Sequence, residues 1–179
     1  SGTKYLTAGP HDIVMGYYNS GGGYSYYVYI TTPGGAKVPL PNTSLSSGPA
    51  IGSLNGVAES TLVVSNCNLL VSQTTPGTFN GPIVGSGGLY KIGASTLTLA
   101  GTNTYTGNTI VNGGTLALGA GGSIGNSGTI TVNSGSTLDV SAVSGGYALG
   151  GGLTLGGSGT VTGNGTGATG GALQPGGDN

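Results

Sequence analysis

The chain has 179 residues, which is long enough for one domain with a continuous buried core. Charged residues make up only 4% of it and glycine occupies 42 positions, whereas globular proteins average about 25% charged residues and about 7% glycine. The chain has three lysines and four acidic residues, which give a net charge of -1. We therefore expect no basic surface that would bind nucleic acid or an anionic membrane.

The spacing of the glycines and the pattern of the apolar residues exclude two of the architectures that are rich in glycine. Collagen needs glycine at every third position with abundant proline, whereas these glycines fall irregularly among only 8 prolines. A disordered linker lacks apolar periodicity, whereas this chain is 35% hydrophobic and its apolar residues alternate with Thr or Ser in short runs. No window keeps a helical apolar repeat free of glycine for three turns, so we predict an all-β fold of many short strands.

The first fifty residues are rich in aromatic side chains, and we interpret residues 1–50 as a separate β module or a cap. Ile13 to Tyr18 and Tyr24 to Ile30 predict two strands, and the Gly-rich segment between them predicts a hairpin turn. Six tyrosines in this hairpin are candidate contacts for self-assembly or for a ligand: Tyr17, Tyr18, Tyr24, Tyr26, Tyr27 and Tyr29. We favour packing or polymer contact over ligand binding, because half of such a cluster must face a core.

Four prolines between Thr32 and Pro49 predict a loop over that stretch. After it, short apolar runs at Leu54 to Val57, Thr61 to Ser65 and Leu69 to Ser72 predict strands. We therefore place a domain boundary near residue 50, with a β-helix over residues 51–179.

The second half contains an internal repeat of short strands, in which Leu, Ile or Val alternates mostly with Thr or Ala. The predicted strands are Leu97 to Leu99, Thr109 to Val111, Leu116 to Leu118, Ile130 to Val132, Leu138 to Val140, Leu153 to Leu155 and Thr160 to Thr162. Every second strand recurs at a near-constant interval. The residues of one series, Leu97, Leu116, Leu138 and Val161, are 19, 22 and 23 positions apart, and those of the other, Ile110, Ile130, Leu153 and Leu173, are 20, 23 and 20 apart.

An interval of about twenty residues matches one coil of a β-solenoid, in which equivalent strands stack in parallel about 4.8 Å apart. Inward Leu, Ile and Val then form aliphatic ladders. Glycine and asparagine occupy the expected corners, as at Asn112 to Gly114 and Asn133 to Gly135, because these residues adopt positive φ at low cost.

Residues 88–116 read GLYKIGASTLTLAGTNTYTGNTIVNGGTL, and this segment resembles the autotransporter-associated β-strand repeat of bacterial passenger domains. The family pattern is Leu-x-Lys-x-Gly, then Thr-Leu-Thr-Leu, a Gly-x-Asn-Thr-Tyr-Thr-Gly turn and Val-x-x-Gly-Thr-Leu. Gly171 to Gly176 resembles a Pro-Gly segment that follows such repeats. The resemblance covers about residues 83–176, and it implies a right-handed parallel β-helix displayed outside a bacterial cell.

Catalytic and metal-binding patterns are weak. Asp139 is the one acidic residue between residues 60 and 177, and we interpret it as a solvated residue on an outer face. His11 and Asp12 point apart on a strand and lack a third partner. Gly165 to Gly170 matches a dinucleotide fingerprint only formally, because no amphipathic helix follows. Cys67 is the only cysteine, and we expect a buried thiol, with an interchain disulfide as the alternative. We therefore predict no catalytic residue, no cofactor and no metal.

Two function hypotheses remain. The first is an extracellular structural protein, whose β-helix is a segment of a surface stalk or a subunit that stacks end to end with copies of itself into a fibre. The alternative is an adhesin-like module that binds glycan or a host surface through the tyrosine hairpin. We expect no enzyme, and no helix that spans a membrane, because no apolar run reaches the required ~18 residues.

Overall fold

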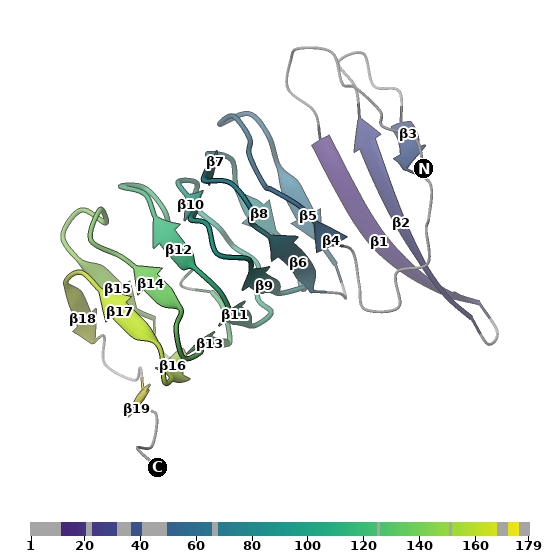
Figure 1. Cartoon of the computed structure of the whole chain (residues 1–179). Coiled ribbons are helices and arrows are strands. Elements are labelled where there is room, and N and C mark those ends of the chain that lie inside the picture. The colour runs from purple at the N-terminus through teal and green to yellow at the C-terminus, as the bar shows by residue number, and fades with distance from the viewer. Residues whose placement is uncertain are drawn as a thin grey trace.

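The computed structural model describes residues 12–20, 23–31, 37–40, 50–65, 68–124, 126–150, 152–167 and 172–175, and it describes their side chains from residue 51 to residue 164. Within these ranges the chain is all β and contains no helix, so no described segment is a candidate membrane-crossing helix. Parallel strands stack into a β-solenoid of about five turns (Figure 1). The predicted fold class is confirmed.

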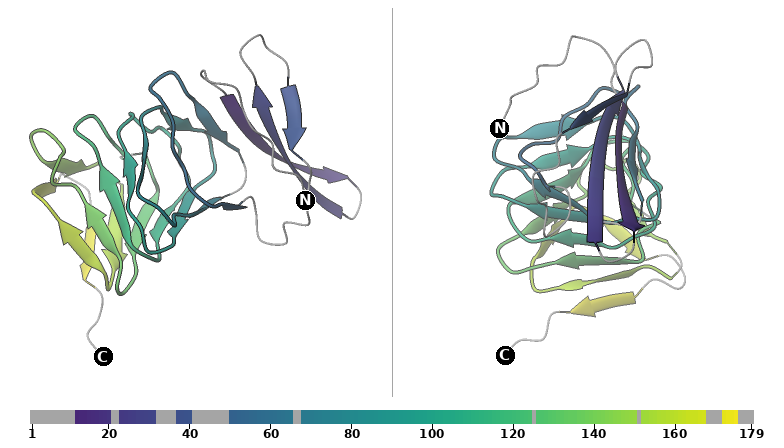
Figure 2. Two further views of the ribbon diagram at one scale, coloured as in Figure 1. Left: turned by 45° about the horizontal axis from the view of Figure 1, so that its top comes forward. Right: turned by 90° about the vertical axis from the view of Figure 1, so that its right-hand side faces the viewer.

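Three sheets form the sides of the solenoid (Figure 2). The hairpin sheet has the order β3-β2-β1-β5-β8 and contains β1 (Asp12–Ser20), β2 (Gly23–Thr31), β3 (Lys37–Leu40), β5 (Leu62–Val64) and β8 (Ile83–Val84). The threonine sheet has the order β17-β14-β12-β10-β7 and contains β7 (Gly77–Phe79), β10 (Leu97–Leu99), β12 (Thr115–Leu118), β14 (Thr137–Asp139) and β17 (Thr160–Thr162).

The third side is a seven-stranded sheet with the order β19-β16-β13-β11-β9-β6-β4. Its strands are β4 (Ala50–Ile51), β6 (Leu69–Ser72), β9 (Leu89–Ile92), β11 (Thr109–Val111), β13 (Thr129–Val132), β16 (Thr154–Gly157) and β19 (Ala172–Pro175). A separate pair joins β15 (Tyr147–Leu149) to β18 (Gly165–Gly167) in parallel.

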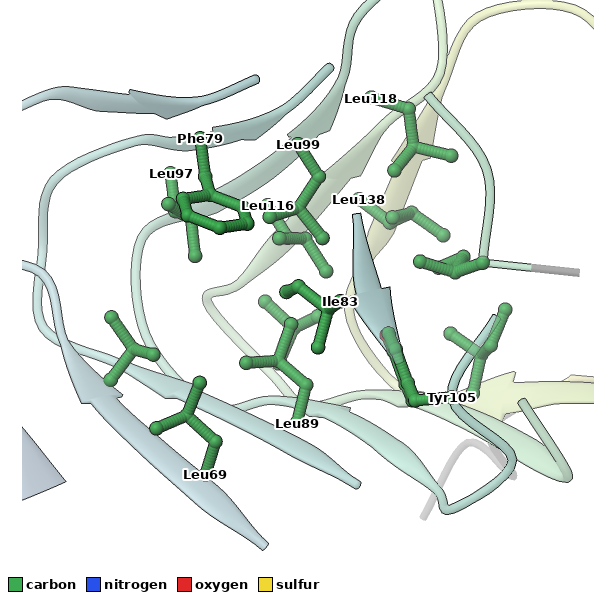
Figure 3. Close-up of a cluster of buried hydrophobic side chains, with 14 of the residues drawn as sticks. Leu69, Phe79, Ile83, Leu89, Leu97, Leu99, Tyr105, Leu116, Leu118 and Leu138 are labelled. Atoms are coloured by element: carbon green, nitrogen blue, oxygen red, sulfur yellow. The ribbon is translucent and has the colours of Figure 1, made fainter. Parts of the chain in front are cut away.

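Stacked aliphatic side chains form the core (Figure 3). In the threonine sheet, parallel pairing places Leu97 beside Leu116, Leu116 beside Leu138 and Leu138 beside Val161. The first three of these side chains are fully buried. Burial of such a side chain contributes roughly 1.5–3 kcal/mol, so the repeated leucine is the main stabilising element of each coil.

The predicted hairpin is present. Strands β1 and β2 pair antiparallel from Asp12 opposite Thr31 to Ser20 opposite Gly23. Strand β1 also pairs in parallel with β5, where Ile13 lies opposite Leu62. The hairpin therefore covers the edge of β5 that the start of the solenoid would otherwise leave open.

Two strand predictions near this end are wrong. The stretch 32–49, predicted as a loop, contains β3, which is the edge strand of its sheet, where a proline such as Pro39 is tolerated. The run Leu54 to Val57 is no strand and forms one isolated bridge between Gly56 and Phe79. The backbone N–H of Leu54 instead donates to Oε1 of the buried Gln73 at 3.0 Å.

The predicted order of the second strand series is confirmed, because β11, β13, β16 and β19 stack in parallel, but the predicted residue register is wrong. Ile130 pairs with Thr109 and with Leu155, and neither Ile110 nor Leu153 is its partner. A shift of one residue moves every side chain to the other face of a sheet. Ile110 is consequently only partly buried on the outer face, and Thr109 occupies the core position.

The two ends of the solenoid differ. At the C-terminal end the threonine sheet stops at β17, which pairs only with β14 among the described strands. Val161 continues the leucine ladder there, yet its side chain is 45% exposed because no described strand lies beyond it. The described part of the chain thus has a covered edge at β5 and an open one at β17.

Candidate functional site

The outer face of the seven-stranded sheet carries apolar side chains in two rows that run across the strands. Parallel register aligns Leu70 with Tyr90, Tyr90 with Ile110 and Ile110 with Thr131. The second row begins with Ser72 beside Ile92 and continues through Asn112 and Asn133. We call these eight residues the Tyr90 face: Leu70, Tyr90, Ile110, Thr131, Ser72, Ile92, Asn112 and Asn133.

Strand alternation explains why these side chains face outward. Their neighbours along the chain, Leu69, Val71, Leu89 and Val111, are fully buried, and successive residues of a strand point to opposite sides of a sheet. Seven residues of the face are partly buried, among them Tyr90, Ile92 and Ile110, and Asn112 is exposed. The result is an aliphatic strip with one aromatic ring that solvent reaches.

Hydrogen bonds between coils hold the polar part of the Tyr90 face. Asn133 Nδ2 donates to Asn112 Oδ1 at 2.9 Å, and Asn112 Nδ2 donates to the hydroxyl oxygen of Tyr90 at 3.2 Å. These three residues come from successive coils, so the chain of bonds follows the stacking direction. It orients the Tyr90 ring before any ligand arrives.

Lys91 lies between Tyr90 and Ile92 but points into the solenoid, where its side chain is 0% exposed. Its Nζ donates to three backbone carbonyls, those of Gly113 at 2.6 Å, Gly93 at 2.8 Å and Ile92 at 3.2 Å. Burial lowers the pKa of Lys91, because the interior disfavours the ammonium. Lys91 therefore joins two corners of adjacent coils and is not available to a ligand outside.

A second buried polar group links Tyr105, Thr109 and Ser127. The Tyr105 hydroxyl bonds to Thr109 Oγ1 at 2.6 Å, and Thr109 Oγ1 bonds to Ser127 Oγ at 2.9 Å. Ser127 Oγ also donates to the carbonyl of Gly107 at 2.8 Å. This network explains why a threonine replaces an aliphatic residue at the core position of β11.

Burial raises the pKa of two tyrosines. The Tyr105 hydroxyl is fully enclosed, and this desolvation outweighs its bond to Thr109, so its pKa rises. Desolvation likewise raises the pKa of Tyr147 to about 12. The Tyr147 side chain is 5% exposed and its hydroxyl has no hydrogen-bond partner in the described part of the chain.

The structure brings the six predicted tyrosines onto two adjacent strands. Tyr17 lies opposite Tyr26, and the other four lie opposite other residues, as in the pairs Tyr18 with Ser25 and Val14 with Tyr29. Their side chains lie outside the described part of the molecule, so their role as contacts stays a prediction. His11 and Cys67 also lie outside the described residues.

Asp139 is partly exposed in β14, beside the buried Leu138. Hydrogen bonds from the hydroxyl and from the backbone N–H of Ser141 lower the pKa of its carboxyl. Among the residues with described side chains, no group of three or more His, Cys, Asp or Glu could hold a metal ion.

A shallow depression lies on the outer face of the threonine sheet, between β7 and β10. Its lining residues are Asn55, Pro76, Gly77, Thr78, Thr96 and Thr98. None of them is charged or has an activated nucleophile beside a base, so the depression offers no catalytic chemistry.

Sequence patterns did not identify the Tyr90 face, because β9 was not among the predicted strands. In this strand the buried residues are Leu89 and Lys91, and the outward ones are Tyr90 and Ile92. Because lysine is normally exposed, the sequence does not show the usual alternation of apolar inward and polar outward residues. The signal that locates the face is the fixed interval from the predicted strand at Leu69 to Ser72.

Comparison with known proteins gives one match. Residues 89–118 match the family model of the passenger-associated-transport-repeat, which confirms the resemblance noted for this segment. No curated protein and no solved structure matches the chain. The matched segment runs from β9 to the end of β12, and it includes the buried Lys91 and Tyr105.

Proposed function

We propose that this chain, whose residues 89–118 carry a passenger-associated-transport repeat, is part of an extracellular structural β-helix that forms a surface stalk. The observation that carries the proposal is the contrast between two sheet edges. The hairpin covers the edge of β5, whereas β17 leaves its edge and Val161 open. A covered edge suits the tip of a stalk, and an open edge suits a junction with further coils.

The interior supports a rigid rod. Leucine ladders and the carbonyl bonds of Lys91 tie each coil to its neighbours, and each coil contacts only the adjacent ones. A solenoid of this kind gains about 4.8 Å in length per coil without any change in cross-section. Length, stiffness and a neutral surface are the properties that a stalk requires.

The family of the matched repeat suggests a secreted or surface location, and a structural role is typical of such a repeat. The two acidic residues with described side chains support a non-enzymatic role, because they lie in different coils. Glu59 precedes β5, whereas Asp139 lies in β14. Polysaccharide-cleaving solenoids need carboxylates close together on one face.

End-to-end stacking into a fibre is the other form of this structural role. Light scattering coupled to size-exclusion chromatography and negative-stain microscopy separate the two forms. A stalk segment is expected to be a monomeric rod. Long filaments that disappear in Val161→Asp would instead support stacking through the open end. Thr162→Asp, on the outer face of the same strand, is the matched control.

Adhesion through the tyrosine hairpin is a second candidate, because the β1–β2 register brings six tyrosines onto two paired strands. A glycan array on the wild-type chain and on a Tyr27→Ala, Tyr29→Ala variant tests it. Binding that the variant loses supports adhesion through the hairpin. Equal binding by both proteins, or none by either, removes the hypothesis.

A further inference from the structure

We propose that the Tyr90 face binds an uncharged polysaccharide laid along the solenoid axis. This site is distinct from the tyrosine hairpin and goes beyond a stalk function. Four features of the face carry the proposal: its chemistry, its order before binding, its charge and its size.

The chemistry of the face matches that of a sugar ring. One side of a pyranose presents C–H groups that pack against an aromatic ring, and its edge presents hydroxyls that bond to amides. Tyr90 supplies the ring, with Leu70 and Ile110 directly beside it in the register. Asn112 and Asn133 supply amides along the neighbouring row, bonded to one another at 2.9 Å.

The face is prepared for a ligand before binding. Asn112 donates to the Tyr90 hydroxyl at 3.2 Å, so the ring has a fixed neighbour on the adjacent coil. The strands beneath pair continuously from β6 to β13. Ordering of loops and side chains therefore costs little on binding, which favours affinity for a weakly interacting ligand.

The charge of the face selects the class of polymer. None of its eight residues is Asp, Glu, His, Lys or Arg, and Lys91 on the same strand points inward with all its donors directed at backbone carbonyls. An acidic polysaccharide or a nucleic acid would lose hydration without gaining a partner. A neutral glucan or mannan meets no such penalty.

The size of the face argues against a second copy of the chain as its occupant. A stable protein interface takes about 800 Å² from each partner, far more than the four partly exposed apolar side chains supply. A linear polysaccharide needs only a narrow strip, and the two rows run in one direction across four coils. Apolar side chains lie at one end of the rows and the two asparagines at the other, so a polymer along the rows meets both apolar contacts and amides.

Affinity electrophoresis in gels with soluble neutral β-glucan or mannan, against polygalacturonate, tests the proposal on the full chain. We expect retardation by a neutral polymer and none by the acidic one. Tyr90→Ala is expected to weaken binding about tenfold, which is the upper range for loss of one aromatic contact. Tyr90→Phe keeps the ring and is expected to stay within about threefold of the wild type.

Thr98→Ala, on the outer face of the threonine sheet, is the matched control and is expected to bind as the wild type does. Circular dichroism and thermal unfolding establish that each variant is folded. Three outcomes overturn the proposal: no binding to either neutral polymer, equal binding by folded Tyr90→Ala, or loss of binding only in the Tyr27→Ala, Tyr29→Ala variant. Self-association that Tyr90→Ala abolishes, without polymer binding, would assign the face to a second copy instead.

Discussion

Buried polar side chains distinguish this solenoid from a purely aliphatic stack. Lys91 occupies a ladder between Val71 and Val111, where an apolar residue would pack well. Its burial is compensated because the ammonium bonds to carbonyls of two corners, and those carbonyls belong to Gly93 and Gly113. A buried ammonium whose N–H donors all have acceptors stabilises the turns, whereas a buried ammonium without acceptors lowers the stability of the fold.

Lys91→Met is expected to lower the free energy of unfolding by about 1–3 kcal/mol. The methionine fills much of the volume, but the carbonyls of Gly93 and Gly113 lose their donor. Urea denaturation followed by circular dichroism measures the change. Thr98→Met on an outer face is the control, and an equal effect of both substitutions would show that the carbonyl bonds contribute nothing.

Two buried tyrosines are predicted to respond in opposite ways to loss of the hydroxyl. Tyr105→Phe breaks a 2.6 Å bond to Thr109 and should cost about 0.5–1.5 kcal/mol. Tyr147→Phe removes a buried hydroxyl without a described partner and should leave stability unchanged or raise it by about 1 kcal/mol. The same denaturation experiment compares them, and a large destabilisation by Tyr147→Phe would contradict the assignment.

Alkaline pH should destabilise the fold through these tyrosines. Their pKa is raised in the folded chain, so their contribution is fully present below pH 10 and is lost as pH rises from 10 toward about 12. Each group contributes a slope of at most about 1.4 kcal/mol per pH unit in that window. Chemical denaturation between pH 9 and 11 measures the decline.

Tyr147→Phe serves as the control for this pH dependence, because without the Tyr147 hydroxyl the free energy of unfolding should fall less steeply as the pH rises. The lowered pKa of Lys91 acts in the opposite direction below its ordinary value of 10.5. Comparison of the variant with the wild type cancels the lysine contribution. Identical slopes in the two proteins would mean that Tyr147 ionises equally easily in both states.

At the level of the strand, corner glycines decide how closely successive coils approach. Gly93 has φ of 81°, and a Cβ there would lie 2.4 Å from the carbonyl oxygen of Gln73 on the preceding coil. Gly135 has a similar φ of 74°, yet a Cβ there meets no atom within 4 Å. The two positions therefore separate backbone strain from contact between coils.

Gly135→Ala is expected to cost about 1 kcal/mol, from positive φ alone. Gly93→Ala carries the same strain plus a clash with backbone that cannot rotate away, so its cost should exceed that of Gly135→Ala by more than about 1 kcal/mol. Thermal unfolding of the two variants provides the comparison. Equal costs would show that adjacent coils separate easily at this corner.

Across the whole molecule, the hairpin is the feature that ends the parallel stack. Strand β1 joins β5 in parallel, and β2 then turns the sheet antiparallel, so the coil pattern does not continue past it. The opposite end has no such reversal among the described strands, and Val161 lies exposed there.

Deletion of residues 1–49 removes β1 to β3 and uncovers the edge of β5. We expect the shortened chain to self-associate at lower concentration than the full-length chain, because the edge of β5 is then open in addition to that of β17. Deletion of residues 1–11 alone keeps β1, so this variant should have the same association state as the full-length protein. Light scattering measures the mass of both, and a monomeric 50–179 chain would show that β5 needs no cover.

The sequence by itself determined the class of fold. Leucines at intervals of 19 to 23 residues, with glycine at the corners, fit only a stack of parallel coils, and strands such as Thr109 to Val111 were predicted with their true bounds. Local pattern suffices there because each coil repeats the same burial and the same turn chemistry.

Only the tertiary structure decided which residues of a coil face inward where polar groups enter the core. Lys91 and Thr109 lie inside because a carbonyl and a hydroxyl of the next coil, some twenty residues away, bond to them, and Tyr105 bonds in turn to Thr109. No local pattern encodes such partners. The same inward turn of Lys91 and Thr109 sets Tyr90 and Ile110 on the outside, so the candidate binding face exists because of contacts between coils.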